Sequence, residues 1–103
     1  MPMKGYVLVD REVLNREAFA EFAPRIAEAI AAHGGRFLAR GGAVEVTEGD
    51  WTPRGIVIVE FESFERARGF MSSPEYAALE GLRERSMRSR TMVVEGYDPD
   101  AGS

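Results

Sequence analysis

The stretch His33-Gly34-Gly35-Arg36-Phe37-Leu38-Ala39-Arg40-Gly41-Gly42 decides the fold of this 103-residue chain. Two glycine pairs bracket a short segment, Arg36–Arg40, which is predicted to be a strand. Gly34 stands where a left-handed residue ends a helix, and Gly41-Gly42 predicts a bulge or a bend. The stretch therefore marks a helix that stops abruptly and passes into a strand.

A helix is expected before this stretch. Asn15 is a suitable N-cap residue, and apolar residues then recur at helical spacing up to His33. Pro24 lies inside the helix, where it removes a backbone donor and clashes with the carbonyl group of Ala20. A kink or a break near Pro24 is therefore expected.

The remaining elements follow from composition and turn signals. A β-α-β-β-α-β order results, which is the ferredoxin-like split arrangement of the α+β class, with an antiparallel-rich four-stranded sheet. Strands are expected at Gly5–Asp10, Ile56–Phe61 and Thr91–Tyr97, with Val44–Glu48 continuing the second strand, and helices are expected from Ser63 to about Met71 and from Ser73-Pro74 onward.

Length and charge limit the function classes. The chain is short enough for one domain, expected over residues 1–97, with 98–103 as a flexible tail. Its net charge is −4, and its basic residues are interleaved with acids, so nucleic acid is not an expected partner. It has no cysteine for disulfides or thiolate metal sites. No apolar run is long enough to span a membrane, and a cytoplasmic location is expected.

Alternation along the strands separates two sheet faces. The face that the helices should cover is wholly apolar. It is expected to contain Val7, Val9, Phe37, Ala39, Val57, Val59, Phe61, Met92 and Val94. The other face is expected to contain Tyr6, Leu8, Asp10, Arg36, Leu38, Arg40, Ile56, Ile58, Glu60, Thr91, Val93 and Glu95.

The middle of the second face is apolar, although no helix is left to cover it. Exposing its leucine, isoleucine and valine side chains would forgo several kcal/mol at roughly 25 cal/mol per Å². A second copy of the chain is the economical cover. The sheets of two copies are therefore expected to face each other in a dimeric α+β barrel.

The chain resembles domain of unknown function family 1330, within the dimeric α+β barrel superfamily. The resemblance covers nearly all of residues 3–97. It implies a homodimer with an inner cleft, and no particular reaction. The features that carry it are Gly5-Tyr6, the 33–42 stretch, Glu48-Gly49 with Trp51 and Arg54, Val59-Glu60-Phe61, and Ser73-Pro74-Glu75-Tyr76.

Arg40, Trp51 and Arg54 are the sharpest candidates for a binding site. A loop tryptophan beside an arginine can stack on an organic acid and pair with its charge, and Arg40 is expected at the same rim. The alternative is that Trp51 packs over the barrel mouth or the dimer seam. A small organic anion is the ligand that these residues would suit.

Three further residues form a second candidate. The first and third strands are expected to be parallel neighbours, which would bring Asp10 and Glu60 together, with Arg36 nearby. This cluster is either an acid/base pair with separated pKa values or a structural ion-pair cluster, and the structural alternative is favoured.

Two other side chains, His33 and Tyr76, are weaker candidates for a functional role. His33 is expected to cap or pack the end of its helix rather than act as a base. Tyr76 falls in register with Leu79 and is expected in the core. No metal or cofactor is expected, since the chain contains no phosphate-binding, triad or metal motif and a haem would need His33 as its ligand.

Two functions of different class follow. One is a cofactor-independent enzyme, of the monooxygenase or isomerase kind, acting on a small anionic or aromatic metabolite in the cleft. The other is a non-catalytic dimeric module that binds a small ligand or has a structural role. An open, partly polar cavity would favour an active site, and a cavity filled by side chains would favour the structural role.

Overall fold

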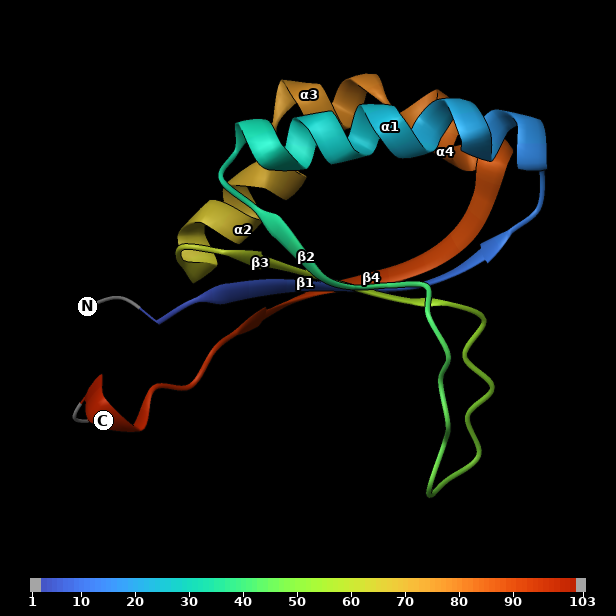
Figure 1. The fold of residues 1–103 in the computed structure, drawn as a ribbon. Helices are drawn as coiled ribbons and strands as arrows, with labels where there is room; N and C mark the ends of the chain where they lie inside the picture. Colours follow the sequence, from blue (N-terminus) through green and yellow to red (C-terminus); the bar gives the residue numbers. More distant parts are fainter. Residues whose placement is uncertain (1–2, 102–103) are drawn as a thin grey trace.

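A computed structural model describes residues 3–101 of the protein (Figure 1). One sheet carries all the helices on a single face, which confirms the expected α+β architecture. The elements are β1 (Gly5–Val13), α1 (Arg16–Ala32), β2 (Arg36–Arg40), β3 (Ile56–Phe61), α2 (Phe64–Met71), α3 (Pro74–Ala78), α4 (Glu80–Ser86), β4 (Met87–Glu95) and a short 3₁₀ turn (Pro99–Ala101).

The sheet has the ferredoxin-like order β2-β3-β1-β4, and every neighbouring pair is antiparallel. The expected parallel pairing of the first and third strands is therefore wrong. Tyr6 lies opposite Glu60, and Asp10 lies opposite Ile56. As a result Asp10 and Glu60 occupy opposite ends of the sheet instead of one cluster.

Side-chain caps and a glycine determine where α1 begins and ends. The Asn15 side chain accepts a hydrogen bond from the Ala18 N–H at 3.0 Å, as expected for an N-cap. After His33 the chain turns at Gly34, whose φ of +79° is the left-handed conformation that ends a helix. Ser63 and Ser73 cap α2 and α3 in the same way as Asn15.

Pro24 does not break α1, which is one element from Arg16 to Ala32. The missing backbone donor costs about 3 kcal/mol in a helix interior. Phe22 and Ile30, on either side of Pro24, are buried. Each contributes about 1.5–3 kcal/mol on burial, so packing offsets the loss and the expected break is wrong.

A register shift in β2 reverses the position expected for Arg40. Phe37 lies opposite Val59, but Ala39 lies opposite Ile58, so the pairing slips by one residue between them. A one-residue slip moves the following side chains to the other face of the sheet. Arg40 therefore lies on the helix side, with its guanidinium 4.2 Å from the centre of the Phe37 ring.

β4 begins four residues earlier than expected. Its residues also alternate in the opposite sense, so those expected on the helix side lie on the open face and the reverse. Because β1 extends to Val13, the residues from Met87 onward have a partner strand. Val93 packs against the core on the helix side, whereas Met92 is 60% exposed on the open face. The run of adjacent apolar residues gives no clear alternation, which is why the sequence did not reveal the correct face.

Residues 41–55, called the arm below, form an irregular loop and not the expected continuation of β2. Figure 1 shows the arm extending away from the sheet on the side opposite the helices. Residues 41–52 are all exposed. The alternating Val44–Glu48 segment has no strand edge to pair with here, so its pattern does not produce a strand.

Replacing Gly34 with valine should lower the free energy of unfolding by about 1–2 kcal/mol, because a β-branched residue disfavours positive φ. A Cβ atom there would meet only Arg66 Nη1, at 3.9 Å, so the cost is conformational. Denaturant unfolding followed by circular dichroism measures it. Gly42→Val is the matched control, since Gly42 has open space and no positive φ. Equal stability of the two variants would contradict the assignment.

Candidate functional site

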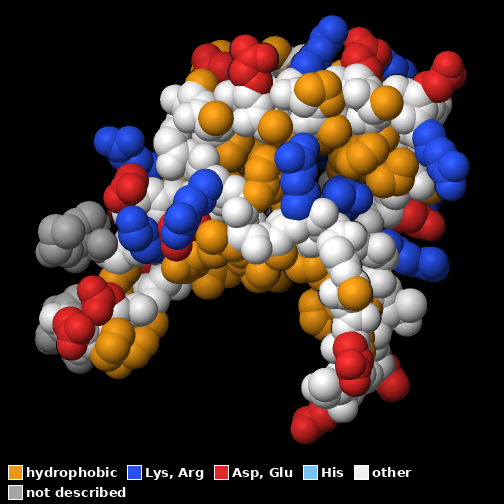
Figure 2. All heavy atoms as spheres, viewed as in Figure 1, with side chains coloured by type: hydrophobic (Ala, Val, Ile, Leu, Met, Phe, Trp, Pro, Cys, Tyr) orange, Lys and Arg blue, Asp and Glu red, His pale blue; other side chains and the backbone are white. Residues whose placement is uncertain are grey.

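A cavity of about 80 Å³ lies between the helix layer and the covered face of the sheet. Phe19 and Phe22 of α1 and Phe37 of β2 contribute to its apolar walls. In Figure 2, apolar atoms are visible in the hollow between the two layers, with Lys and Arg side chains gathered beside them. The mouth of this hollow is therefore basic, and its interior is apolar.

Three arginines line the cavity, together with the hydroxyl-bearing residues Tyr76, Ser89 and Thr91. The arginines come from three elements: Arg11 from β1, Arg40 from β2 and Arg83 from α4. No Asp, Glu or His is among the lining residues. The charged side chains that line the cavity are therefore all positive, and no lining residue carries a carboxylate or an imidazole.

Arg11 and Arg40 are neighbours with like charge. The Arg11 guanidinium lies 4.9 Å from the centre of the Phe19 ring. Burial lowers the pKa of Arg11 below its ordinary value, and the nearby charge of Arg40 lowers it further. Arg40 Nη2 donates a long hydrogen bond, 3.4 Å, to the Ala23 carbonyl oxygen. Among the described residues, neither side chain forms an ion pair.

Gly41 makes room for Arg11. A Cβ atom at Gly41 would lie 2.7 Å from Arg11 Nη2, too close for a real contact. Gly41 also has a φ of +74°, which other residues rarely adopt. The glycine predicted to bend the chain after β2 therefore also leaves space for a cavity arginine.

Arg83 points from the helix layer into the same cavity. Its guanidinium lies 5.8 Å from the centre of the Tyr76 ring. Arg83 Nε is buried and has no hydrogen-bond partner among the described residues. The charged run from Arg83 onward is typical of a solvated helix face, but Arg83 departs from this pattern. Spacing held a signal for it, because Arg83 follows Leu79 by four residues and both share one face.

Trp51 and Arg54 lie on the other side of the sheet and do not share a rim with Arg40. Asp10 Oδ1 accepts hydrogen bonds from the backbone N–H groups of Arg54 (2.9 Å) and Gly55 (3.3 Å). Asp10 Oδ2 accepts one from Trp51 Nε1 at 3.4 Å. The Arg54 N–H is the main reason that the pKa of Asp10 is lowered. Asp10 therefore anchors the base of the arm.

An open hollow of about 380 Å³ lies around this anchor. Arg88 and Arg90 of β4 line it together with Asp10, Trp51 and Arg54. Acidic side chains, Glu12 and Asp50, line it as well. The charged residues that line this hollow have both signs, whereas those that line the inner cavity are all arginines. Anion binding by Trp51 and Arg54 stays a prediction.

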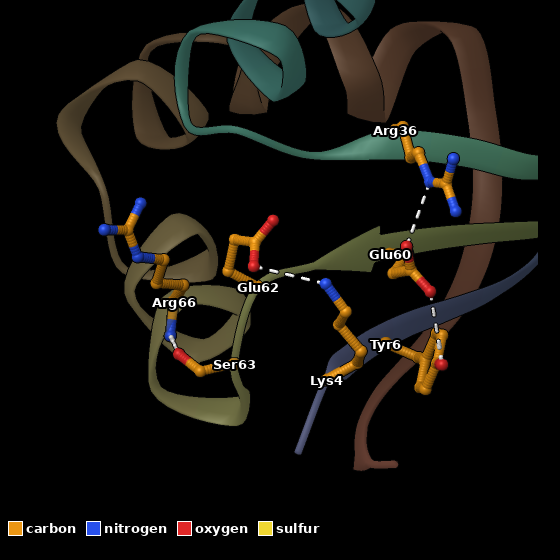
Figure 3. A network of polar contacts seen from close by, with 7 residues as sticks. All are labelled: Lys4, Tyr6, Arg36, Glu60, Glu62, Ser63 and Arg66. Atoms are coloured by element: carbon orange, nitrogen blue, oxygen red, sulfur yellow. Dashed lines mark hydrogen bonds and ion pairs between the residues drawn. The ribbon is translucent and has the colours of Figure 1, made fainter. Parts of the chain in front are cut away.

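Glu60 belongs to a polar network at the opposite end of the sheet (Figure 3). Its Oε1 atom accepts a hydrogen bond from Arg36 Nε at 2.9 Å, and its Oε2 atom accepts one from the Tyr6 hydroxyl at 3.3 Å. The expected contact of Arg36 with Glu60 is present, but Asp10 is not part of it. The network is thus an ion pair with a tyrosine donor, not a pair of carboxylates.

His33 packs and bonds at the end of α1, as expected. Its Nε2 atom donates to Glu75 Oε1 at 2.7 Å, and its ring meets the Phe70 ring edge-on at 5.2 Å between centres. The hydrogen bond from His33 is the main cause of the lowered pKa of Glu75. Tyr76 also packs against Phe70, so its expected place in the core is confirmed.

A family model described as "Domain of unknown function (DUF1330)" matches residues 4–97. Among curated proteins none matches the sequence. Within residues 3–101, no helix is long and apolar enough to cross a membrane.

Solved structures of low sequence identity share the fold. A protein of unknown function from Rhodopseudomonas palustris has a TM-score of 0.71 at 16% identity, covering 96% of this chain and 86% of that one. SnoaB, a cofactor-independent oxygenase from Streptomyces nogalater, has a TM-score of 0.57 at 14% identity, covering 93% and 95%. A dimeric ferredoxin-like protein of unknown function from Bacteroides fragilis has a TM-score of 0.51 at 13% identity, covering 89% and 95%.

Trp51, the single tryptophan, reports on the anchor of the arm. Because folding lowers the pKa of Asp10, its contribution to stability is present above the ordinary value of 3.8 and is lost as the pH falls below it. Trp51 fluorescence should therefore change in that acidic range, and Asp10→Asn should remove the transition. Circular dichroism, recorded in parallel, separates this step from global unfolding. An identical transition in Asp10→Asn would contradict the assignment.

Proposed function

The chain belongs to the DUF1330 family of domains of unknown function, and we propose that it binds a small organic anion in the cavity between its helix layer and its sheet. Arg11 and Arg40 hold the anionic group, and the phenylalanine-rich walls hold the apolar part of the ligand. The observation that carries this proposal is a cavity lined by three arginines and no acidic residue.

The two neighbouring arginines explain why an anion suits the mouth. The like charges of Arg11 and Arg40 repel, and the partly buried Arg11 guanidinium loses hydration without gaining a carboxylate partner among the described residues. A ligand carboxylate would accept charge-assisted hydrogen bonds from both arginines. Part of the cost of holding the arginines together would then be recovered when the ligand binds, which is the arrangement expected of a binding site.

A second candidate function is a cofactor-independent oxygenase or isomerase acting on the bound ligand. The likeness to SnoaB favours this candidate, although at 14% identity it shows the fold alone. The lack of Asp, Glu and His in the cavity lining favours binding over proton transfer. Oxygen uptake with hydroquinone carboxylic acids as probes tests the oxygenase: uptake that Arg11→Ala abolishes would support it, and no uptake would count against it.

We also propose that the open face of the sheet pairs with a second copy of the chain. Large apolar side chains are exposed on that face, on the arm and after β4, among them Met92 at 60%, Trp51 at 60% and Tyr97 at 79%. Figure 2 shows apolar atoms along the underside of the sheet, between two projecting segments. A concave apolar face of this kind suits a self-complementary partner.

Arg11→Ala and Arg40→Ala should each weaken the binding of small carboxylates by about 1.5–3 kcal/mol, the range for a hydrogen bond to a charged group. Isothermal titration calorimetry with butyrate, hexanoate and benzoate measures the effect. Arg36→Ala is the matched control, because it removes the same charge from β2 on the other face of the sheet. If all three variants bind like the wild type, the cavity is not the site.

Ile58→Asp should convert the dimer to a species of 11.4 kDa in light scattering, because it places a charge in the centre of the apolar face. The wild type should show twice that mass. Leu14→Asp is the control, since Leu14 is an exposed leucine outside the sheet strands. A monomeric wild type at micromolar concentration would refute the proposed pairing.

A further inference from the structure

Arg83 lines the cavity without a polar partner for its side chain among the described residues. Its Nε atom is buried and unpaired, and no hydrogen bond or ion pair among the described residues uses its guanidinium. Its guanidinium lies 5.8 Å from the centre of the Tyr76 ring, near the outer limit of about 6 Å for a cation–π interaction. A buried donor without an acceptor is unfavourable unless a ligand supplies one.

The position of Arg83 differs from that of the arginines at the mouth. Arg11 and Arg40 project from the sheet, whereas Arg83 projects from α4 in the helix layer. Both walls of the cavity therefore present a guanidinium to the same space. A ligand with one carboxylate on Arg11 and Arg40 would leave Arg83 unpaired, and a second acceptor group would satisfy it.

We propose that Arg83 binds a second carboxylate of the ligand, so that the cavity is specific for a short dicarboxylate. This inference rests on the proposed anion-binding function and defines its ligand class. Two negative charges would face three positive ones, in a cavity with no acidic lining residue of its own. The apolar walls would contact the carbon chain between the two carboxylates.

The volume of the cavity limits the length of the carbon chain between the two carboxylates of the ligand. A volume of about 80 Å³ holds roughly six water-sized groups, at about 10–15 Å³ each. Two carboxylates alone contain six non-hydrogen atoms, so the cavity leaves room for a linker of only a few carbon atoms. The inferred ligand is therefore short, and long-chain diacids should bind poorly.

Calorimetry with matched acids tests this inference. Succinate, glutarate and adipate are compared with butyrate, valerate and hexanoate, which have the same chain lengths and one carboxylate. The wild type should bind at least one of the dicarboxylates about tenfold or more tighter than its partner, the difference expected for one added charged hydrogen bond. Arg83→Met should abolish this preference and leave the affinity for monocarboxylates unchanged.

Two further variants make the result specific. Arg85→Met removes the same charge from the exposed side of α4 and should keep the preference. Arg83→Lys keeps the positive charge but lacks the planar guanidinium, so it should keep part of the preference for dicarboxylates. Without ligand, Arg83→Met should be no less stable to heat than the wild type, because it removes an unpaired buried donor. If Arg83→Met does not fold, Arg83 is structural and the inference fails.

The outcomes separate this inference from the proposed function. If monocarboxylates bind and dicarboxylates bind no tighter, or if Arg83→Met keeps the preference, the second carboxylate is refuted and the anion site stands. If neither class of acid binds, the proposed function fails, and this inference fails with it. If the preference disappears with Arg83→Met alone, both are supported.

Discussion

The one-sided cover of the sheet is the constraint on which the rest of the structure depends. Because all helices lie on one face, each successive strand residue points either into the inner cavity or toward the open face. Asp10 and Arg11 show the consequence. Adjacent in sequence, they serve different sites: Asp10 binds the arm on the open side, and Arg11 lines the cavity on the helix side.

The sequence predicted those parts of the fold whose signals are local. The caps at Asn15, Ser63 and Ser73 and the turn at Gly34 depend on a few neighbouring residues, and all are observed. Alternation also placed the β1 and β3 residues on the correct faces. The family resemblance, which draws on motifs spread along the chain, agreed with the observed architecture.

The sequence did not predict features that depend on strand pairing. The slip in β2 moved Arg40 to the other face, and β4 acquired its first residues only because β1 is long enough to pair with them. Arg40 was therefore expected at the wrong rim, and Arg11 was not expected at a site at all. Arg11 continues the inward alternation of Val7 and Val9, but it lies one residue beyond the expected end of the strand.

Adjacent residues of β1 attach the arm to the cavity. The Arg11 N–H donates to the Gly55 carbonyl oxygen at 2.9 Å, while its guanidinium lies against Gly41 at the other end of the arm. A molecule that restrains the Arg11 side chain would therefore also restrain the end of the arm at Gly41. Because such coupling is reciprocal, a partner that holds the arm would strengthen binding inside the cavity, and each protomer of an assembly would respond to the occupancy of its own cavity.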